Sequence, residues 1–241
     1  MTKGQLKNAH IKVLVVLSLL FLAVSIYFHS IENFVVYRAL RGVICFVFLG
    51  AAFLLHKHRV HSLVVTFLLL YGGSSIATVW YENSVIATLS MALNFSAFML
   101  LIGALSPKIA FKKMNVLFTA IFIILVLVNA YLLYIFIEMI RDFAHGELHY
   151  FMIMLGAMSL VIAGFLALLY NHQLSTKGSL LFTVFVFVLV FAEVFRAIAY
   201  YDFAYGNFSV YTARALLLLG VALLIHYDLI HKKTSEVLSR K

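Results

Sequence analysis

The sequence has few of the residues that shape soluble domains. Its 241 residues include one proline, one cysteine and 11% charged residues, whereas a soluble domain carries about 25% charged residues. Pro107 falls between two apolar runs, so none of these runs contains a proline kink. Cys45 has no second cysteine to pair with, which excludes an internal disulfide.

Long apolar runs take up most of the chain instead. Hydrophobic residues make up 65% of it, and a transmembrane helix needs about 20 consecutive apolar residues. Eight runs meet this requirement without the alternation of barrel strands: residues 11–29, 35–55, 62–80, 84–105, 115–139, 150–171, 178–201 and 208–230. We therefore predict an all-α polytopic membrane protein, a single bundle over residues 1–241 with no soluble domain.

The loop charges predict an orientation. If the N-terminus is cytoplasmic, every lysine, together with Arg59 and Arg240, falls on the cytoplasmic side, as the positive-inside rule requires. The other side has Arg141 as its only basic loop residue and six acidic residues: Glu32, Glu82, Glu138, Asp142, Glu147 and Asp202. This pattern predicts cytoplasmic termini, and the short chain fits a bacterial inner membrane. It also makes the net charge of +9 a sign of topology, so we expect no nucleic-acid partner.

Four arginines break this pattern because they lie within or at the edge of apolar runs. Ionisable groups at such positions are costly and usually face the bundle interior or a wet cavity. At a rise of 1.5 Å per residue, Arg41 and Arg214 lie about 9 Å below the outer surface, Arg196 about 8 Å and Glu193 about 12 Å. The fourth arginine, Arg38, is near the edge and is expected to reach the interface. The sequence thus predicts a charged layer in the outer third of the membrane.

The spacing of this charged layer predicts a pocket. Glu193, Arg196 and Tyr200 share one helix face and would form one wall of a pocket open to the outer side. Arg41 and Arg214 would lie opposite or beside that wall. Two interpretations remain open: Glu193 joins helices through a structural ion-pair network, or the excess positive charge binds an anionic ligand such as a phosphate head group.

Neutral polar residues lie in neighbouring spans. Tyr71 and Asn94 are further candidate ligand-binding residues, although an asparagine in a span commonly serves as interhelical glue. The glycines in two spans predict close helix approach at Gly72–Gly73 and, more weakly, at Gly156 and Gly164.

The histidines do not predict a metal site. "HKHRVH" at residues 56–61 and "HGELH" at residues 145–149 are interpreted as solvated loops, since neither has the ligand spacing of a known zinc site. We therefore predict no metal and no cofactor.

The order of features resembles the YhhN or lysoplasmalogenase-like membrane protein family. "YRALRG" keeps a basic residue, Arg38, where that family has Lys-Pro-Leu, and "LLYGGSSI" keeps Gly72 but has Gly73 in place of an aspartate. "SMALNFSAF" places Asn94 near the family's histidine, and "VFAEVFRAI" has Ala192–Glu193 in place of Ser-Asp. "VYTARALLLLG" is similar to the start of the family's last span.

This resemblance implies an eight-helix fold with cytoplasmic termini and cleavage of the vinyl-ether bond of lysoplasmalogens. That reaction needs a proton donor and a base, and two carboxylates can share these roles. Here one carboxylate is absent and the other is Glu193, close to Arg196. We therefore expect a non-catalytic protein that binds membrane lipid, or a subunit of a larger membrane-protein complex. The alternative is a lipid hydrolase with Glu193 as its catalytic acid and base.

Overall fold

The computed structural model describes residues 3–55, 60–110, 116–201 and 206–238. Within these ranges the chain is helical and contains no strand. The helices are α1 (Lys3–Ser30), α2 (Phe34–Leu55), α3 (Ser62–Ala77), α4 (Ser84–Leu105), α5 (Val116–Ile140), α6 (Glu147–Leu174), α7 (Lys177–Tyr200) and α8 (Gly206–Leu238), and short 3-10 turns η1 (Thr78–Trp80), η2 (Ser106–Lys108) and η4 (Arg141–Phe143) follow α3, α4 and α5. Some residues used in the predictions above lie outside these ranges and are not described: His56, Lys57, His58, Arg59, Lys112, Lys113, Asp202, Arg240 and Lys241.

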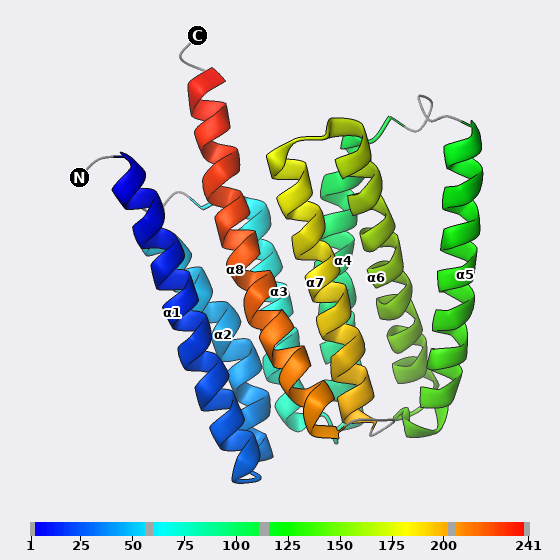
Figure 1. Ribbon diagram of the computed structural model, residues 1–241. Coiled ribbons are helices and arrows are strands. Elements are labelled where there is room, and N and C mark those ends of the chain that lie inside the picture. The colour runs from blue at the N-terminus through cyan, green and yellow to red at the C-terminus, as the bar shows by residue number, and fades with distance from the viewer. Residues whose placement is uncertain (1–2, 56–59, 111–115, 202–205, 239–241) are drawn as a thin grey trace.

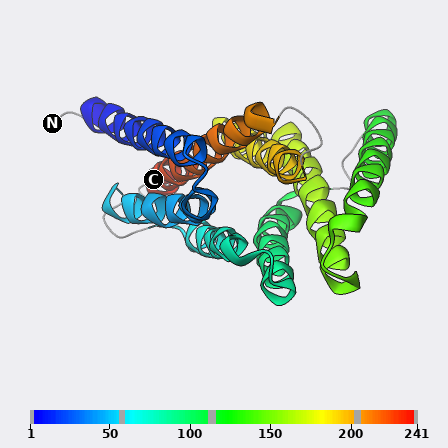
Figure 2. The ribbon, with the colours of Figure 1, turned by 90° about the horizontal axis from the view of Figure 1, so that it is seen from below.

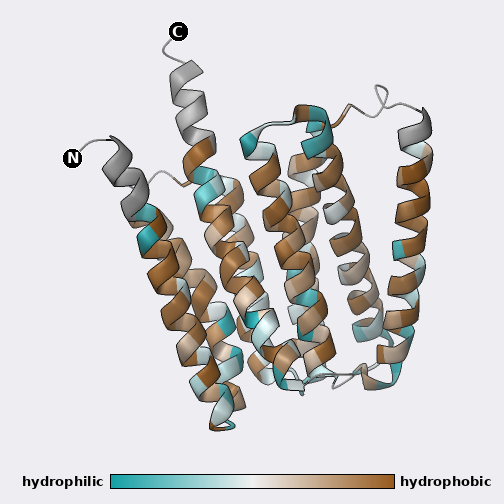
Figure 3. Cartoon of the chain, in the orientation of Figure 1, coloured by the Kyte–Doolittle hydropathy of each residue, from teal (hydrophilic) through white to brown (hydrophobic). Residues whose placement is uncertain are grey.

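The predicted spans are confirmed. Eight helices in the described ranges are long and apolar enough to cross a membrane, and each overlaps one predicted run. Figure 3 shows apolar residues along most of every helix, with polar residues gathered near the helix ends. The chain is therefore an all-α, multi-pass membrane protein. The largest difference in length is at α8, which continues beyond the predicted end at residue 230 to Leu238.

Local signals explain where several helices begin. The Asn83 side chain accepts hydrogen bonds from the backbone N–H groups of Val85 and Ile86, which caps α4. At the start of α7, Thr176 and Ser179 form a reciprocal capping box. Such caps satisfy donors that the first turn of a helix cannot pair internally, so they fix these boundaries in the sequence.

Six helices form a closed ring. Contacts run from α2 to α3, α4, α6, α7 and α8 in turn, and α8 returns to α2. Helix α1 packs on α2 and α8, whereas α5 packs mainly on α6 and stands at the edge of the molecule (Figure 2). Most of the apolar surface of α5 is consequently exposed.

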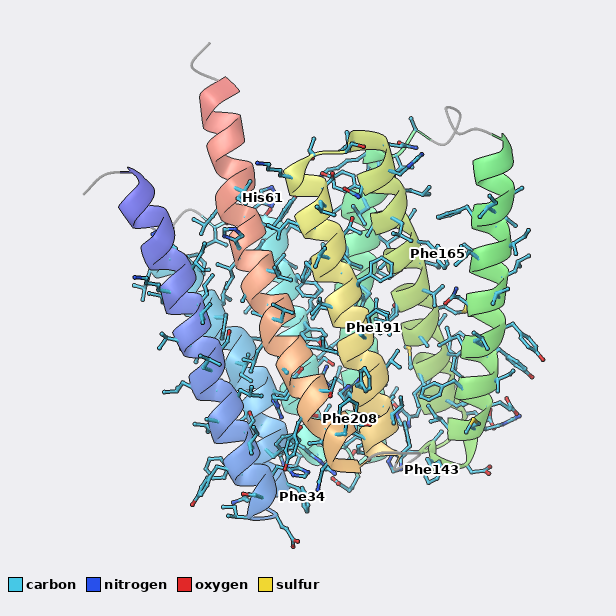
Figure 4. The ribbon with its side chains drawn as sticks, in the orientation of Figure 1. Phe34, His61, Phe143, Phe165, Phe191 and Phe208 are labelled. Atoms are coloured by element: carbon cyan, nitrogen blue, oxygen red, sulfur yellow. The ribbon has the colours of Figure 1, made fainter. Side chains whose placement is uncertain are left out.

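The two termini lie at the same end of the bundle (Figure 1). We call the opposite end the distal end; Phe34, Phe143 and Phe208 mark it in Figure 4, where His61 lies toward the terminal end. Termini on one side are expected when the chain crosses the membrane an even number of times. The charged residues predicted to share one layer all belong to the distal half.

Aromatic rings fill the middle of the ring of helices. Phe67 stacks on Tyr71 with ring centroids 5.4 Å apart, and it meets Phe98 and Phe185 edge to face. These four side chains come from α3, α4 and α7 and are fully buried. Such pairings stabilise the fold beyond the effect of burying their area. This aromatic cluster therefore supports the helix packing next to the distal half.

Close backbone approach occurs between α2 and α3. A Cβ atom on Gly42 would lie 2.8 Å from the carbonyl oxygen of Gly72, and one on Gly72 would lie 3.0 Å from Cys45 Cβ. The prediction for Gly72 is therefore confirmed. The predictions for Gly73, Gly156 and Gly164 are wrong, because a Cβ there would meet nothing closer than 3.8 Å. Gly156 faces open space, and Gly73 and Gly164 face only side chains at ordinary contact distance. None of the three approaches a neighbouring backbone closely.

Candidate functional site

A buried carboxylate organises the distal half. Glu193, on α7, is only 4% exposed. Its Oε1 atom accepts hydrogen bonds from Arg41 Nη2 and from the Tyr71 hydroxyl. Its Oε2 atom accepts from Arg196 Nε and Nη2 at 2.9 and 2.6 Å and from Asn94 Nδ2 at 3.4 Å. This Glu193 cluster joins α2, α3, α4 and α7 through one side chain.

The cluster satisfies the rule that a buried charge needs partners. Arg41 and Arg196 form salt bridges with opposite oxygens of Glu193, and Tyr71 and Asn94 complete its hydrogen bonding. Arg196 lies one helical turn after Glu193, so their contact follows from the i, i+3 spacing. The spacing therefore predicted the contact of Glu193 with Arg196, but not that Tyr71 and Asn94 would also bind the carboxylate.

Arg214, on α8, lies beside the cluster and does not bind the carboxylate. It is 4% exposed, its Nη2 donates to the carbonyl oxygen of Tyr37 at 2.7 Å, and its guanidinium stacks over the Tyr37 ring at 4.3 Å. Its Nη1 atom has no hydrogen-bond partner among the described residues. The buried Nε of Arg41 is likewise without a partner there. The site thus retains donor capacity on two buried arginines.

Arg38 and Tyr200 lie nearer the solvent at the distal end. Arg38 Nη1 donates to Glu82 Oε1 at 2.6 Å, and the guanidinium lies 5.7 Å from the centre of the Tyr200 ring. The hydrogen bond from Arg38 lowers the pKa of Glu82, so this partner stays ionised at neutral pH. Arg38 is therefore held in an ion pair with an exposed carboxylate at the mouth of the bundle.

A cavity of about 700 Å³ opens at this end, within the size range of small-molecule sites. Its described lining contains four arginines, one carboxylate and two of the neutral candidates: Arg38, Arg41, Arg196, Arg214, Glu193, Asn94 and Tyr200. Tyr71 is not part of this lining. Much of the remaining wall is apolar and includes Leu133, Phe136 and Ile137 of α5, and Gly156 of α6 lies opposite open space. The cavity therefore combines a basic region with an apolar wall.

Tyr81 and His149 are distal residues that the sequence analysis missed. His149 is fully buried, so its interpretation as part of a solvated loop is wrong. Its Nε2 pairs with the Tyr81 hydroxyl at 2.8 Å, and its Nδ1 accepts from the backbone N–H of His145 at 3.0 Å. Burial raises the pKa of Tyr81, which keeps this hydroxyl protonated. The available signal was helical spacing, because His149 precedes the buried Ile153 and Gly156 by four and seven residues.

No cluster of metal-binding side chains is found within the described ranges. Comparison with protein-family models, curated proteins and solved structures found no match to this chain. The site must therefore be interpreted from its own geometry.

Proposed function

We propose that this protein binds an anionic membrane lipid in the distal cavity, without catalysing a reaction. The observation that carries this proposal is the combination of four arginines with one carboxylate in a cavity whose wall continues as apolar side chains of α5. Arginine presents a planar set of donors that matches phosphate oxygens, and the apolar wall suits an acyl chain. An amphiphile satisfies both halves of the lining, whereas a purely polar solute satisfies only one.

The position of Arg214 supports a binding role. Buried polar groups are almost always hydrogen-bonded, yet Arg214 Nη1 is buried and has no partner among the described residues. Arg214 itself lines the cavity, so an anion bound there would lie beside this incompletely hydrogen-bonded guanidinium. The Glu193 carboxylate, in contrast, is already satisfied by hydrogen bonds and holds Arg41 and Arg196 in place.

The alternative function is a lysoplasmalogenase-like hydrolase with Glu193 as its catalytic acid and base. The geometry favours the binding role over this alternative. Both oxygens of Glu193 accept hydrogen bonds from a guanidinium group and from a neutral donor. A carboxylate engaged in this way has little room to approach a substrate oxygen or a water molecule.

We also propose that the terminal end faces the cytoplasm of a bacterial inner membrane, on the basis of the lysine distribution. In intact cells, a membrane-impermeant maleimide is expected to label Ser84→Cys but not Ser106→Cys, both in a Cys45→Ala background. These exposed serines lie at opposite ends of α4, so they form a matched pair. Labelling of Ser106→Cys alone would reverse the proposed orientation.

Lipid binding can be tested by native mass spectrometry of the full chain, gently extracted from its own membranes. We expect one retained phospholipid per protein. Gly156→Phe is expected to displace this lipid because it fills the cavity without removing a charge. Arg214→Ala is expected to displace it by removing a positive charge from the lining. Arg141→Ala is the matched control, since Arg141 is an exposed arginine paired with Glu138 near the same end.

Two results would contradict the proposal. The first is a protein that retains no lipid in any mild detergent. The second is a lipid retained equally in Gly156→Phe, Arg214→Ala and Arg141→Ala, which would place it on the outer surface of the bundle. A stoichiometric partner protein in place of lipid would instead assign the function to a membrane complex.

A further inference from the structure

We infer that the lipid bound in the distal cavity carries a doubly charged head group, a phosphomonoester or a diphosphate, and not a singly charged phosphodiester. This inference rests on the proposed lipid-binding function and narrows the class of ligand. It follows from the charge balance of the cavity, from the arginines that line it and from the different exposure of those arginines.

The charge balance of the described cavity is positive. Its lining holds Arg38, Arg41, Arg196 and Arg214 against Glu193. Glu82 is an exposed carboxylate outside this lining, and its ion pair with Arg38 neutralises the charge of Arg38. About two positive charges therefore remain without a counter-charge among the described residues. A singly charged head group would leave one of them uncompensated in a largely buried site, which is costly, whereas a doubly charged group balances both.

The arginines of the lining also suit a group with several terminal oxygens. Arg214 lies on α8 and Arg41 on α2, and both residues line the cavity. Their like charges repel each other, and an anion in the cavity would offset that repulsion. A phosphomonoester offers three strong acceptor oxygens and a charge of about −1.5 to −2 near neutral pH. A phosphodiester offers two such oxygens and one charge.

The arginines differ in exposure, which gives the head group a direction of entry. Arg41 and Arg214 are buried, whereas the side chains of Arg38 and Arg196 keep 29% and 28% of their surface exposed. The more exposed pair can meet an incoming anion first, and the buried pair can then hold it. The apolar wall provided by α5 favours a lipid over free inorganic phosphate, because phosphate alone would leave that wall in contact with water.

Matched lipids can test this inference. Binding of the full chain in detergent micelles at pH 8 is measured for phosphatidic acid, a phosphomonoester, and for phosphatidylglycerol, a phosphodiester, with identical acyl chains. We expect phosphatidic acid to bind at least about tenfold more tightly, and inorganic phosphate to compete only weakly. In Arg214→Ala this preference is expected to shrink severalfold.

A second variant keeps the inference testable if Arg214→Ala does not fold. Glu82→Gln alters only an exposed carboxylate and adds one positive charge at the rim, so it is expected to tighten binding of phosphatidic acid severalfold. Glu138→Gln, which removes an exposed carboxylate paired with Arg141, is its control and is expected to change nothing.

The failures can be told apart. Equal affinity for the two lipids, lost in Gly156→Phe, would overturn the inference and leave the proposed lipid binding intact. Binding of neither lipid would overturn both. Full competition by inorganic phosphate at the concentration of the lipid would also overturn the inference, because it would show a site for the free anion.

Discussion

Glu193→Ala is expected to lower the free energy of unfolding by about 3–5 kcal/mol, since removing one partner of a buried ion pair leaves the other charge uncompensated. Here two guanidinium groups, those of Arg41 and Arg196, would lose their common partner, and Tyr71 would lose its acceptor. The measurement is the unfolding transition in mixed micelles titrated with a denaturing detergent. Glu138→Gln is the matched control: its ion pair with Arg141 is exposed, so we expect a change below about 1 kcal/mol.

A double-mutant cycle separates the ion pair from other effects of the substitution. Arg41→Ala removes the opposite partner, and the double variant should cost less than the sum of the two single variants by about 0.5–3 kcal/mol. Strict additivity would show that Arg41 and Glu193 act independently. A Glu193→Ala protein as stable as the parent would remove the scaffold role from Glu193 and restore the case for a catalytic one.

Gly42→Ala is expected to lower the free energy of unfolding by about 1–3 kcal/mol, which is the usual cost of overpacking. The added Cβ would lie 2.8 Å from the carbonyl oxygen of Gly72, and a backbone atom cannot move aside as a side chain can. Helices α2 and α3 would have to separate, and this would move Arg41 away from Tyr71. Gly42→Leu is therefore expected to prevent folding altogether.

Gly50→Ala in the same helix is the control for this substitution. A Cβ on Gly50 would meet nothing within 4 Å, so this variant is expected to keep or gain up to about 1 kcal/mol through its better helix propensity. The comparison uses the same unfolding measurement. Equal free energies of unfolding for Gly42→Ala and Gly50→Ala would show that the α2–α3 contact tolerates a wider spacing than the structure indicates.

Part of the candidate site could be predicted because few charged residues occur in membrane spans. Arginine and glutamate are so costly in an apolar span that their presence alone marks an interior or a cavity. Helical rise then gives the depth of each, and helical spacing gives its face, which together predicted that Arg41, Glu193, Arg196 and Arg214 would line one pocket. The structure places all four in the lining of the same cavity.

The partners of these charges could not be predicted in the same way. Arg214 and Arg41 have the same residue type and a similar depth, yet one binds the Tyr37 carbonyl oxygen and the other binds Glu193. Which of the two arginines reaches the carboxylate depends on how α2 and α8 are rotated against α7. The sequence spacing within each helix contains no information on that rotation.

The sequence by itself determined the helical class, the number of spans and the layer in which the charges lie, since each of these depends on local apolar length and on helical geometry. Only the tertiary structure decided that His149 is buried against Tyr81, that Gly42 meets Gly72, and that α5 supplies an apolar wall to an arginine-lined cavity. These features depend on which helix faces meet across the bundle, and neighbours of this kind are set by packing between residues far apart in the chain.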